Sequence, residues 1–257
     1  MGRRSMKLRD KVAIVTGASR GIGRAAAIEL AKHGADVTLS FAVHREEAED
    51  AAREIQRLGR RALLFQGDVA DRASDQRMVA ETVRAFGRLD ILVANAAFSV
   101  RKPFLELEVE DVERTWAVSL WGVFHCCQIA ARQMVAQGGG GNLVVVSSVH
   151  SFRPYPAASA YNGAKAAINQ MALTWAGELI GHGIRVNVLE PGWTDTPGER
   201  QFNTEKELRN GGEKVPIGRL ARPEEMAKGI LFLVSDEDSS YMTGGCLRMD
   251  GGFTLVH

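Results

Sequence analysis

The chain has 257 residues, a formal net charge of +1 and 45% hydrophobic residues. That length suits one α/β domain with a sizeable core, and the balanced charge argues against a nucleic-acid partner or an anionic membrane surface. No apolar run approaches the roughly 20 residues that span a bilayer. Three cysteines, two of them adjacent, make no disulfide framework, so we expect reduced thiols and a cytoplasmic protein.

Strand and helix patterns alternate along the chain. Short apolar runs predict strands at Val12–Thr16, Asp36–Ser40, Arg61–Gln66, Ile91–Ala94, Leu143–Ser147, Arg185–Leu189 and Cys246–Met249. Longer segments predict helices at Gly23–His33, Glu46–Leu58, Ser74–Phe86, Asp111–Ala136, Ala160–His182 and Pro223–Ser235. This rhythm predicts one α/β domain over 1–257, a Rossmann-type doubly wound seven-stranded parallel sheet with helices on both faces. Ligands then bind beyond the carboxyl ends of the strands.

Two segments fall outside this rhythm. Residues 1–9 carry charge but no apolar stretch, so we expect a flexible N-terminal segment and no signal peptide. Residues 193–214 are rich in Gly, polar and charged side chains and follow the sixth predicted strand. Their place at the ligand-binding edge predicts a mobile lid over substrate, with an ordinary surface insertion as the alternative.

A glycine-rich turn follows the first predicted strand, with the sequence Gly17-Ala18-Ser19-Arg20-Gly21-Ile22-Gly23. Glycines at a strand-to-helix turn let the backbone approach a pyrophosphate, and the helix N-terminus holds that anion. The spacing is G-x-x-x-G-x-G, which differs from the usual G-x-G-x-x-G dinucleotide fingerprint. The turn therefore predicts nucleotide binding only in combination with other residues.

Ser148, Tyr161 and Lys165 bring together a hydroxyl, a phenol and an ammonium. Tyr161 and Lys165 are four residues apart and share one face of a helix. A nearby ammonium lowers the pKa of a tyrosine from about 10, so that Tyr161 can act as general acid or base on a substrate oxygen. Ser148 would hydrogen-bond the same oxygen and stabilise charge that develops there.

Taken together, these motifs resemble the classical short-chain dehydrogenase/reductase family over nearly the whole chain. Thr16-Gly17-x-x-x-Gly21-Ile22-Gly23 matches its cofactor turn, and Ser148, Tyr161 and Lys165 fall on its catalytic positions. Asp68-Val69 resembles the adenine-contacting pair, Pro191-Gly192 with Thr194 and Thr196 the nicotinamide-side loop, and Met249-Asp250-Gly251-Gly252 the closing D-G-G.

The resemblance implies hydride transfer between a nicotinamide and an alcohol or carbonyl substrate, in a homotetramer with no metal site. Lys165 would also bind the nicotinamide ribose. The implied cofactor-binding residues are Gly17, Ser19, Arg20, Gly21, Ile22, Gly23, Ser40, Asp68, Val69, Asn95, Ala96, Tyr161, Lys165, Pro191, Gly192, Thr194 and Thr196.

The end of the second predicted strand bears on the choice between NAD and NADP. A carboxylate there would bind the adenosine ribose 2′-OH and select NAD, but residues 39–45 contain no acid. Arg20 stands where basic residues of NADP-preferring relatives meet the 2′-phosphate, and His44 or Arg45 could assist. Ala42 falls where many of those relatives carry a second Arg. We expect a preference for NADP(H), with use of NAD(H) left open.

Two positions depart from the family pattern. Ser119 replaces an Asn that holds a water in the proton relay of the lysine, and a hydroxyl is shorter and has one donor fewer. Ser119 stays a catalytic candidate while the relay stays open. Ala94-Asn95-Ala96-Ala97 stands where the family commonly has N-N-A-G, and we expect Asn95 to keep its structural role.

The segment from Ser147 to Tyr161 is similar to that of bacterial glucose 1-dehydrogenases, so we expect a small sugar or polyol substrate held by Ser148, His150 and Tyr161. The alternative is a 3-oxoacyl-thioester reductase, which would need a basic patch for an acidic carrier protein. A second alternative, encouraged only by Ser119, binds NADP(H) without turnover. Candidates for the basic patch are Arg3, Arg4, Arg101, Lys102 and Arg132.

Overall fold

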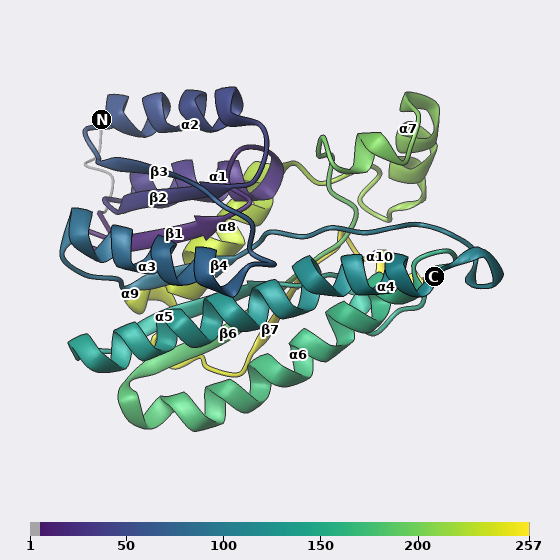
Figure 1. Cartoon of the computed structure of the whole chain (residues 1–257). Helices are drawn as coiled ribbons and strands as arrows, with labels where there is room; N and C mark the ends of the chain where they lie inside the picture. Colours follow the sequence, from purple (N-terminus) through teal and green to yellow (C-terminus); the bar gives the residue numbers. More distant parts are fainter. Residues whose placement is uncertain (1–5, 257) are drawn as a thin grey trace.

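The computed structural model in Figure 1 describes residues 6–256 as one parallel sheet covered by helices. Seven strands pair in the order β3-β2-β1-β4-β5-β6-β7. They are β1 (Val12–Thr16), β2 (Asp36–Phe41), β3 (Ala62–Gln66), β4 (Ile91–Ala94), β5 (Gly141–Val146), β6 (Ile184–Pro191) and β7 (Cys246–Met249). Each predicted strand is present with only its ends shifted, which confirms the predicted parallel sheet.

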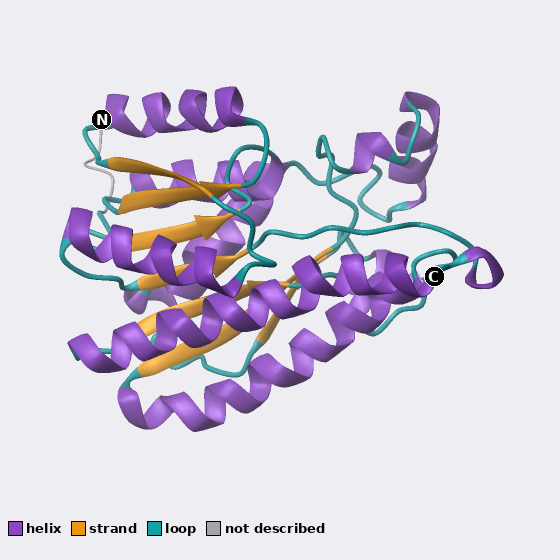
Figure 2. Cartoon of the chain, in the orientation of Figure 1, coloured by secondary structure: helices purple, strands orange, loops and turns teal. Residues whose placement is uncertain are grey.

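Long helices form a layer on each face of the sheet (Figure 2). Those of one layer are α1 (Gly21–Lys32), α2 (Arg45–Arg57) and α8 (Pro223–Val234), and those of the other are α3 (Arg72–Phe86), α5 (Val123–Gln137) and α6 (Ser159–Leu179). Shorter helices are α4 (Val109–Trp116), α7 (Glu205–Lys214), α9 (Asp236–Ser239) and α10 (Phe253–Val256). Single 3₁₀ turns lie at Phe104–Glu106, Val149–Ser151, Ile180–His182 and Glu199–Gln201. The doubly wound arrangement is therefore confirmed.

Successive residues of the central strands face opposite layers. In β1, Ala13 and Val15 pack with α1 and α8, whereas Ile14 packs with α5 and α6. Because both faces are buried, the strand is a continuous apolar run without polar alternation. All strands are parallel, so their carboxyl ends share one edge, where the loops meet.

The sequence predicts one helix over Asp111–Ala136, and this prediction is wrong in its middle. Residues Ala117–Gly122 form a wider π-helical segment between α4 and α5. Two contacts occur there that a helical sequence pattern does not predict. The Ser119 hydroxyl bonds the backbone of Phe98, and Gly122 packs so closely on Val69 that a Cβ would lie 2.7 Å from its Cγ2. π-Helical segments of this kind are frequent at functional sites.

Residues 1–5 of the predicted flexible N-terminal segment lie outside the described residues, and so do Arg3 and Arg4 of the suggested basic patch. Leu8, within the same segment, is buried, and its N–H donates to the His33 carbonyl over 2.9 Å. No helix within residues 6–256 is both long enough and apolar enough to span a bilayer.

Candidate active site

The glycine-rich turn after β1 requires glycine at three positions, two for their backbone conformation and one for a close contact. Gly17 and Gly21 have φ of 64° and 58°, a region that L-residues rarely adopt. A Cβ on Gly23 would overlap the Gly17 carbonyl oxygen and lie 2.5 Å from Asn95 Nδ2. The N-terminus of α1 has no side-chain cap and no acid in its first turn. Its N–H groups are therefore available to an anion, and the turn fits a pyrophosphate.

Asn95 and Ala96 hold the end of β4 against the end of β1. The backbone N–H groups of both residues donate to Thr16 Oγ1 over 3.0 Å, and Asn95 Nδ2 donates to the Thr16 carbonyl over 2.9 Å. Asn95 thus has the structural role expected of it. These bonds fix the floor of the glycine-rich turn, since Asn95 Nδ2 also lies 3.4 Å from the Gly17 carbonyl oxygen.

The predicted adenosine-side residues lie at the ends of β2 and β3. Asp68 is exposed and accepts the Ala70 N–H over 2.9 Å, while Val69 is buried. This leaves a carboxylate oxygen of Asp68 free to accept an amine. Ser40 is buried in β2, and its carbonyl accepts the Ala18 N–H over 2.9 Å. Ser40 therefore supports the glycine-rich turn through its backbone.

Of the three basic residues considered for a 2′-phosphate, only Arg20 is unpaired within residues 6–256. The Arg45 guanidinium donates to Gln66 Oε1 over 2.7 Å and lies 3.6 Å from Glu49. His44 Nδ1 lies 3.4 Å from Glu47. Arg20, at the N-cap of α1, has no side-chain hydrogen bond or ion pair to a described residue. Its guanidinium is therefore free to meet an anion beside the turn.

Ser148, Tyr161 and Lys165 come together where β5 ends and α6 begins. Ser148 caps the turn after β5 and accepts the His150 N–H over 3.2 Å. Lys165 is buried, its Nζ donates to the Val146 carbonyl over 2.9 Å, and it lies 5.3 Å from the centroid of the Tyr161 ring. The His150 ring contacts the Tyr161 ring edge-on, with centroids 5.3 Å apart. The predicted trio is thus connected through His150 and the Tyr161 ring at the carboxyl edge of the sheet.

Burial shifts the pKa values of Tyr161 and Lys165 away from those expected from the sequence. It lowers the pKa of Lys165 to about 7. The pKa of Tyr161 is raised, first by burial and then by the charge of Glu199, with Arg101 opposing. The Tyr161 pKa is therefore raised, where the sequence predicts that it is lowered. The physical reason is that burial of the phenol, helped by the Glu199 charge, outweighs the positive charge near it.

The Ser119 hydroxyl is already occupied. It donates to the Phe98 carbonyl over 2.6 Å and accepts the Phe98 N–H over 2.9 Å, in a fully buried position. Only one lone pair is left for a relay water. Ser119 therefore ties the loop after β4 to the π-helical segment, and its place among the catalytic groups stays a prediction.

The loop after β6 lies over the glycine-rich turn. Gly192 passes so near the carboxyl end of β7 that a Cβ would lie 2.6 Å from Asp250 Cα. Thr194 is buried and donates to the Gly192 carbonyl over 3.1 Å. Thr196 faces Gly21, with Cγ2 at 3.4 Å from a Cβ built there. Pro191, which ends β6, therefore leads into a loop that approaches the glycine-rich turn, and its role on the nicotinamide side stays a prediction.

Three further polar residues border the trio, and the sequence did not single them out as a unit. Asn162 Oδ1 lies 2.6 Å from His150 Nδ1. Arg101, after β4, pairs with Glu199, after β6, over 2.9 Å and stacks on the Phe202 ring at 4.2 Å. Only the adjacency of Asn162 to Tyr161 could have been seen in the sequence. The Arg101–Glu199 pair joins segments about 100 residues apart, so no local pattern reports it.

Segment 193–214 stands at this edge and contains α7 (Figure 1). The Trp193 ring lies against Gly211, where a Cβ would overlap the ring. A capping box between Thr204 and Glu207 starts α7. The Arg101–Glu199 pair therefore connects segment 193–214 to the loop after β4.

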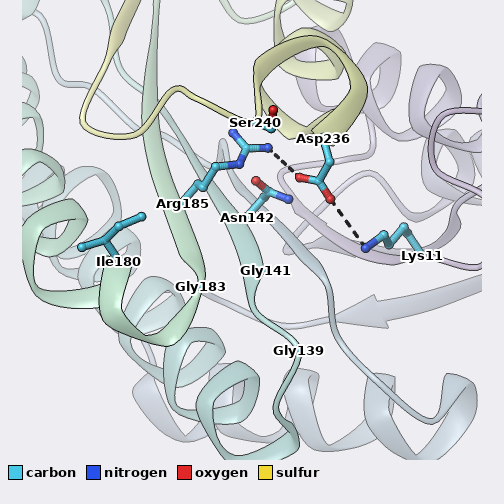
Figure 3. Close-up of a pocket in the computed structure, with 9 residues that line it drawn as sticks. All are labelled: Lys11, Gly139, Gly141, Asn142, Ile180, Gly183, Arg185, Asp236 and Ser240. Carbon is cyan, nitrogen blue, oxygen red and sulfur yellow. Dashed lines mark hydrogen bonds and ion pairs between the residues drawn. The ribbon is translucent and has the colours of Figure 1, made fainter.

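A hollow of about 270 Å³ lies at the opposite edge, between the amino ends of the strands (Figure 3). Its charged groups are paired with one another. Arg185 donates to the Leu233 carbonyl over 3.0 Å and to Asp236 over 3.0 Å, and Asp236 lies 3.8 Å from Lys11. These bonds join β6 to the end of α8. We assign this hollow to structure, because the groups suited to chemistry lie at the carboxyl edge. No cluster of His, Cys, Asp and Glu suited to a metal occurs in residues 6–256.

Comparisons with known proteins agree with this arrangement. A family model described as enoyl-(acyl carrier protein) reductase matches residues 17–254. The chain is 42% identical to the L-rhamnose 1-dehydrogenase (NAD(P)(+)) of Sphingomonas sp. (strain SKA58), over 95% of this chain and 96% of that one. It is 36% identical to a 3-oxoacyl-(acyl-carrier-protein) reductase of Thermotoga maritima, over 97% and 100% of the two chains. The crystal structure of acetoin dehydrogenase from Enterobacter cloacae superposes with a TM-score of 0.88 at 37% identity, covering 96% and 97%.

Proposed function

Because the chain belongs to the short-chain dehydrogenase/reductase family, we propose that it is an NAD(P)-dependent dehydrogenase that oxidises a hydroxyl of a small sugar or polyol. The observation that carries the proposal is the convergence of Ser148, Tyr161 and Lys165 beside an uncapped glycine-rich turn. The bound nicotinamide supplies the acceptor or donor of the hydride.

The protein's own residues handle the substrate oxygen and its proton. Ser148 hydrogen-bonds that oxygen and stabilises its developing charge. Tyr161 takes the hydroxyl proton during oxidation and returns it during reduction. Lys165, held by the Val146 carbonyl with Nζ 5.3 Å from the centroid of the Tyr161 ring, favours the phenolate when its amine is protonated. In a sugar oxidation the anomeric C–H loses hydride while its hydroxyl proton passes to Tyr161.

For the cofactor we propose NADP(H) ahead of NAD(H). Arg20 is unpaired among the described residues, and residues 40–45 offer no carboxylate to a ribose 2′-OH. The pairing of Arg45 with Gln66 and Glu49 leaves Arg20 as the principal 2′-phosphate partner. The related L-rhamnose 1-dehydrogenase carries both cofactors in its name, and we propose some use of NAD by this chain as well.

A sugar or polyol is favoured over a 3-oxoacyl thioester by the pairing of the surface cations. Arg101 pairs with Glu199, and Lys102 pairs with Asp111 over 2.5 Å. Both are therefore partly neutralised as receivers of an acidic carrier protein. The likeness to the Thermotoga maritima reductase keeps the thioester activity as the second candidate. The alternative that the protein binds NADP(H) without turnover is supported only by Ser119. Because Ser119 hydrogen-bonds the backbone of Phe98, it has a structural role that does not depend on this alternative.

We further propose that segment 193–214 closes over the substrate, with the Arg101–Glu199 pair as the contact that holds it. The proposed assembly is a homotetramer in the cytoplasm. Trp116, Trp121, Leu173 and Ile180 expose apolar surface on α4, on the π-helical segment and at α6, where a second copy would bury it. Light scattering of the purified chain tests the tetramer.

The experiment that tests the function is a set of initial rates, followed by absorbance of the reduced nicotinamide with NADP and then NAD. The panel holds L-rhamnose, D-glucose, other aldoses, polyols, gluconate and a 3-oxoacyl thioester, the last in the reductive direction. Turnover of a sugar or polyol that disappears in Tyr161→Phe is the expected result. Turnover of the thioester alone would replace the proposal with the second candidate.

A further inference from the structure

The amide of Asn162 has only one chemically sensible orientation. One end faces the Tyr155 carbonyl oxygen at 3.1 Å, and the other faces His150 Nδ1 at 2.6 Å. A carbonyl can only accept, so the end that faces Tyr155 must be the NH₂ group. The Asn162 oxygen therefore faces His150.

This orientation fixes the tautomer of His150. The Asn162 oxygen has no proton to give, so His150 Nδ1 must carry the proton and donate it. In the neutral ring Nε2 is then a bare acceptor. Within residues 6–256 Nε2 has no hydrogen-bond partner. It is also not among the polar atoms that are both buried and without a partner, so solvent reaches it and a ligand can bind it.

The ring is also fixed in place. It stacks on the Tyr155 ring, with centroids 4.0 Å apart and planes 18° apart, and it meets Tyr161 edge-on at 5.3 Å. The backbone N–H of His150 donates to Ser148 Oγ over 3.2 Å, which fixes the residue beside Ser148. His150 thus adjoins both residues that hold the reacting oxygen, so a group on the neighbouring substrate carbon lies beside it.

We propose that His150 Nε2 accepts a hydrogen bond from a second substrate hydroxyl, on the carbon next to the one oxidised, and that Asn162 is the positioning residue that makes this possible. The inference rests on the proposed function and narrows its substrate class to vicinal diols and 2-hydroxy sugars. A 3-oxoacyl thioester has no hydroxyl donor at that position.

The charge state of His150 agrees with an acceptor role. Burial lowers the pKa of His150 to about 4, and the nearby charges of Arg101 and Lys165 act in the same direction, against the Asn162 hydrogen bond. The ring is thus neutral over the neutral and alkaline pH range. A cationic imidazole would have no free lone pair for a hydroxyl.

The test compares kcat/KM for L-rhamnose and D-glucose with that for their 2-deoxy counterparts. We expect the parent sugar to be favoured about 10-fold, as for one neutral hydrogen bond. His150→Phe keeps an aromatic ring on Tyr155 but has no acceptor, and its preference should fall to within about 2-fold. Equal rates for wild type on parent and 2-deoxy sugars, or an unchanged preference in His150→Phe, would overturn the inference while leaving sugar oxidation standing.

Asn162 is tested through the tautomer itself. Long-range ¹⁵N–¹H spectra of the wild-type ring should show the proton on Nδ1. Asn162→Leu should release it to a mixture and weaken the preference, whereas Asn162→Asp, which keeps the acceptor for His150 but loses the NH₂ donor to the Tyr155 carbonyl, should keep the proton on Nδ1. A proton on Nε2 in wild type would refute the assignment whether or not any sugar is turned over. If the enzyme turned over no sugar or diol, the proposed function would be refuted. The proposed contact between His150 and a substrate hydroxyl would then be refuted as well.

Discussion

Gly23→Ala is the sharpest test of the glycine-rich turn. The new Cβ would overlap the Gly17 carbonyl and lie 2.5 Å from Asn95 Nδ2, whereas ordinary contacts begin at 3.4 Å. One of these groups must therefore move by about 1 Å, and a misplacement of that size can cost on the order of 100-fold. Either movement alters the pyrophosphate cradle, because Asn95 holds it to Thr16. We expect the dissociation constant for NADPH to rise about 100-fold, equivalent to about 2.7 kcal/mol.

The assay is a fluorescence titration with NADPH and NADH, accompanied by thermal denaturation. Gly177→Ala on α6 is the matched control, because nothing lies within 4 Å of a Cβ built there. It should bind cofactor normally and be more stable by at most about 1 kcal/mol. If Gly23→Ala bound NADPH within about 2-fold of wild type at unchanged Tm, the close approach of Gly23 to Gly17 and Asn95 would not matter for binding.

Four further changes have directions that follow from the geometry. Tyr161→Phe should lower kcat by about 10²–10⁴-fold and leave the NADPH dissociation constant nearly unchanged; normal turnover would remove Tyr161 as the general acid and base. Arg20→Ala should weaken NADPH binding more than NADH binding in the same titration, and equal losses would remove the reason to prefer NADP. Glu199→Gln should lower the Tyr161 pKa, because the Glu199 charge raises it, and so move the rising limb of the kcat/KM profile for oxidation to lower pH; an unmoved limb would contradict this. Asp75 on α3 is buried and its pKa is raised by burial to about 7, so its contribution to stability is full below the unfolded pKa and is lost as pH rises through 7. Relative to Asp75→Asn, the wild type should lose up to about 1.4 kcal/mol per pH unit between pH 4 and 7, and urea unfolding at pH 5 and pH 8 that gave the same difference would refute it.

The sheet could be predicted because each strand carries its own signal. Val12–Thr16 and Ile91–Ala94 are short apolar runs bounded by polar residues and glycine, and their bounds in the structure match those predicted. The π-helical segment at 117–122 could not be predicted this way. It coincides with contacts from Ser119 to Phe98 and from Gly122 to Val69, residues 21 and more positions apart that only the tertiary fold brings together.

In the candidate site, too, the sequence predicts some features and not others. The residue types and spacing of Ser148, Tyr161 and Lys165 point to their chemistry, and the fold brings them together at the carboxyl edge of the sheet. What the sequence could not supply is where each polar atom points. The partner of His150 Nδ1 depends on an amide orientation set by the Tyr155 carbonyl, and no spacing rule reports that contact.

The ionisation of Tyr161 and Lys165 carries a consequence for how the site works. Burial raises the tyrosine pKa and lowers that of the lysine, so both shifts favour a neutral phenol above a lysine with a pKa of about 7. A buried neutral pair avoids the cost of two desolvated charges. The phenol then becomes a base only when positive charge reaches its oxygen. Arg101 already acts in that direction, and Glu199 opposes it, so a change in the Arg101–Glu199 pair alters Tyr161 directly. Closure of segment 193–214, which carries Glu199, would in this way tune the same proton that the reaction moves.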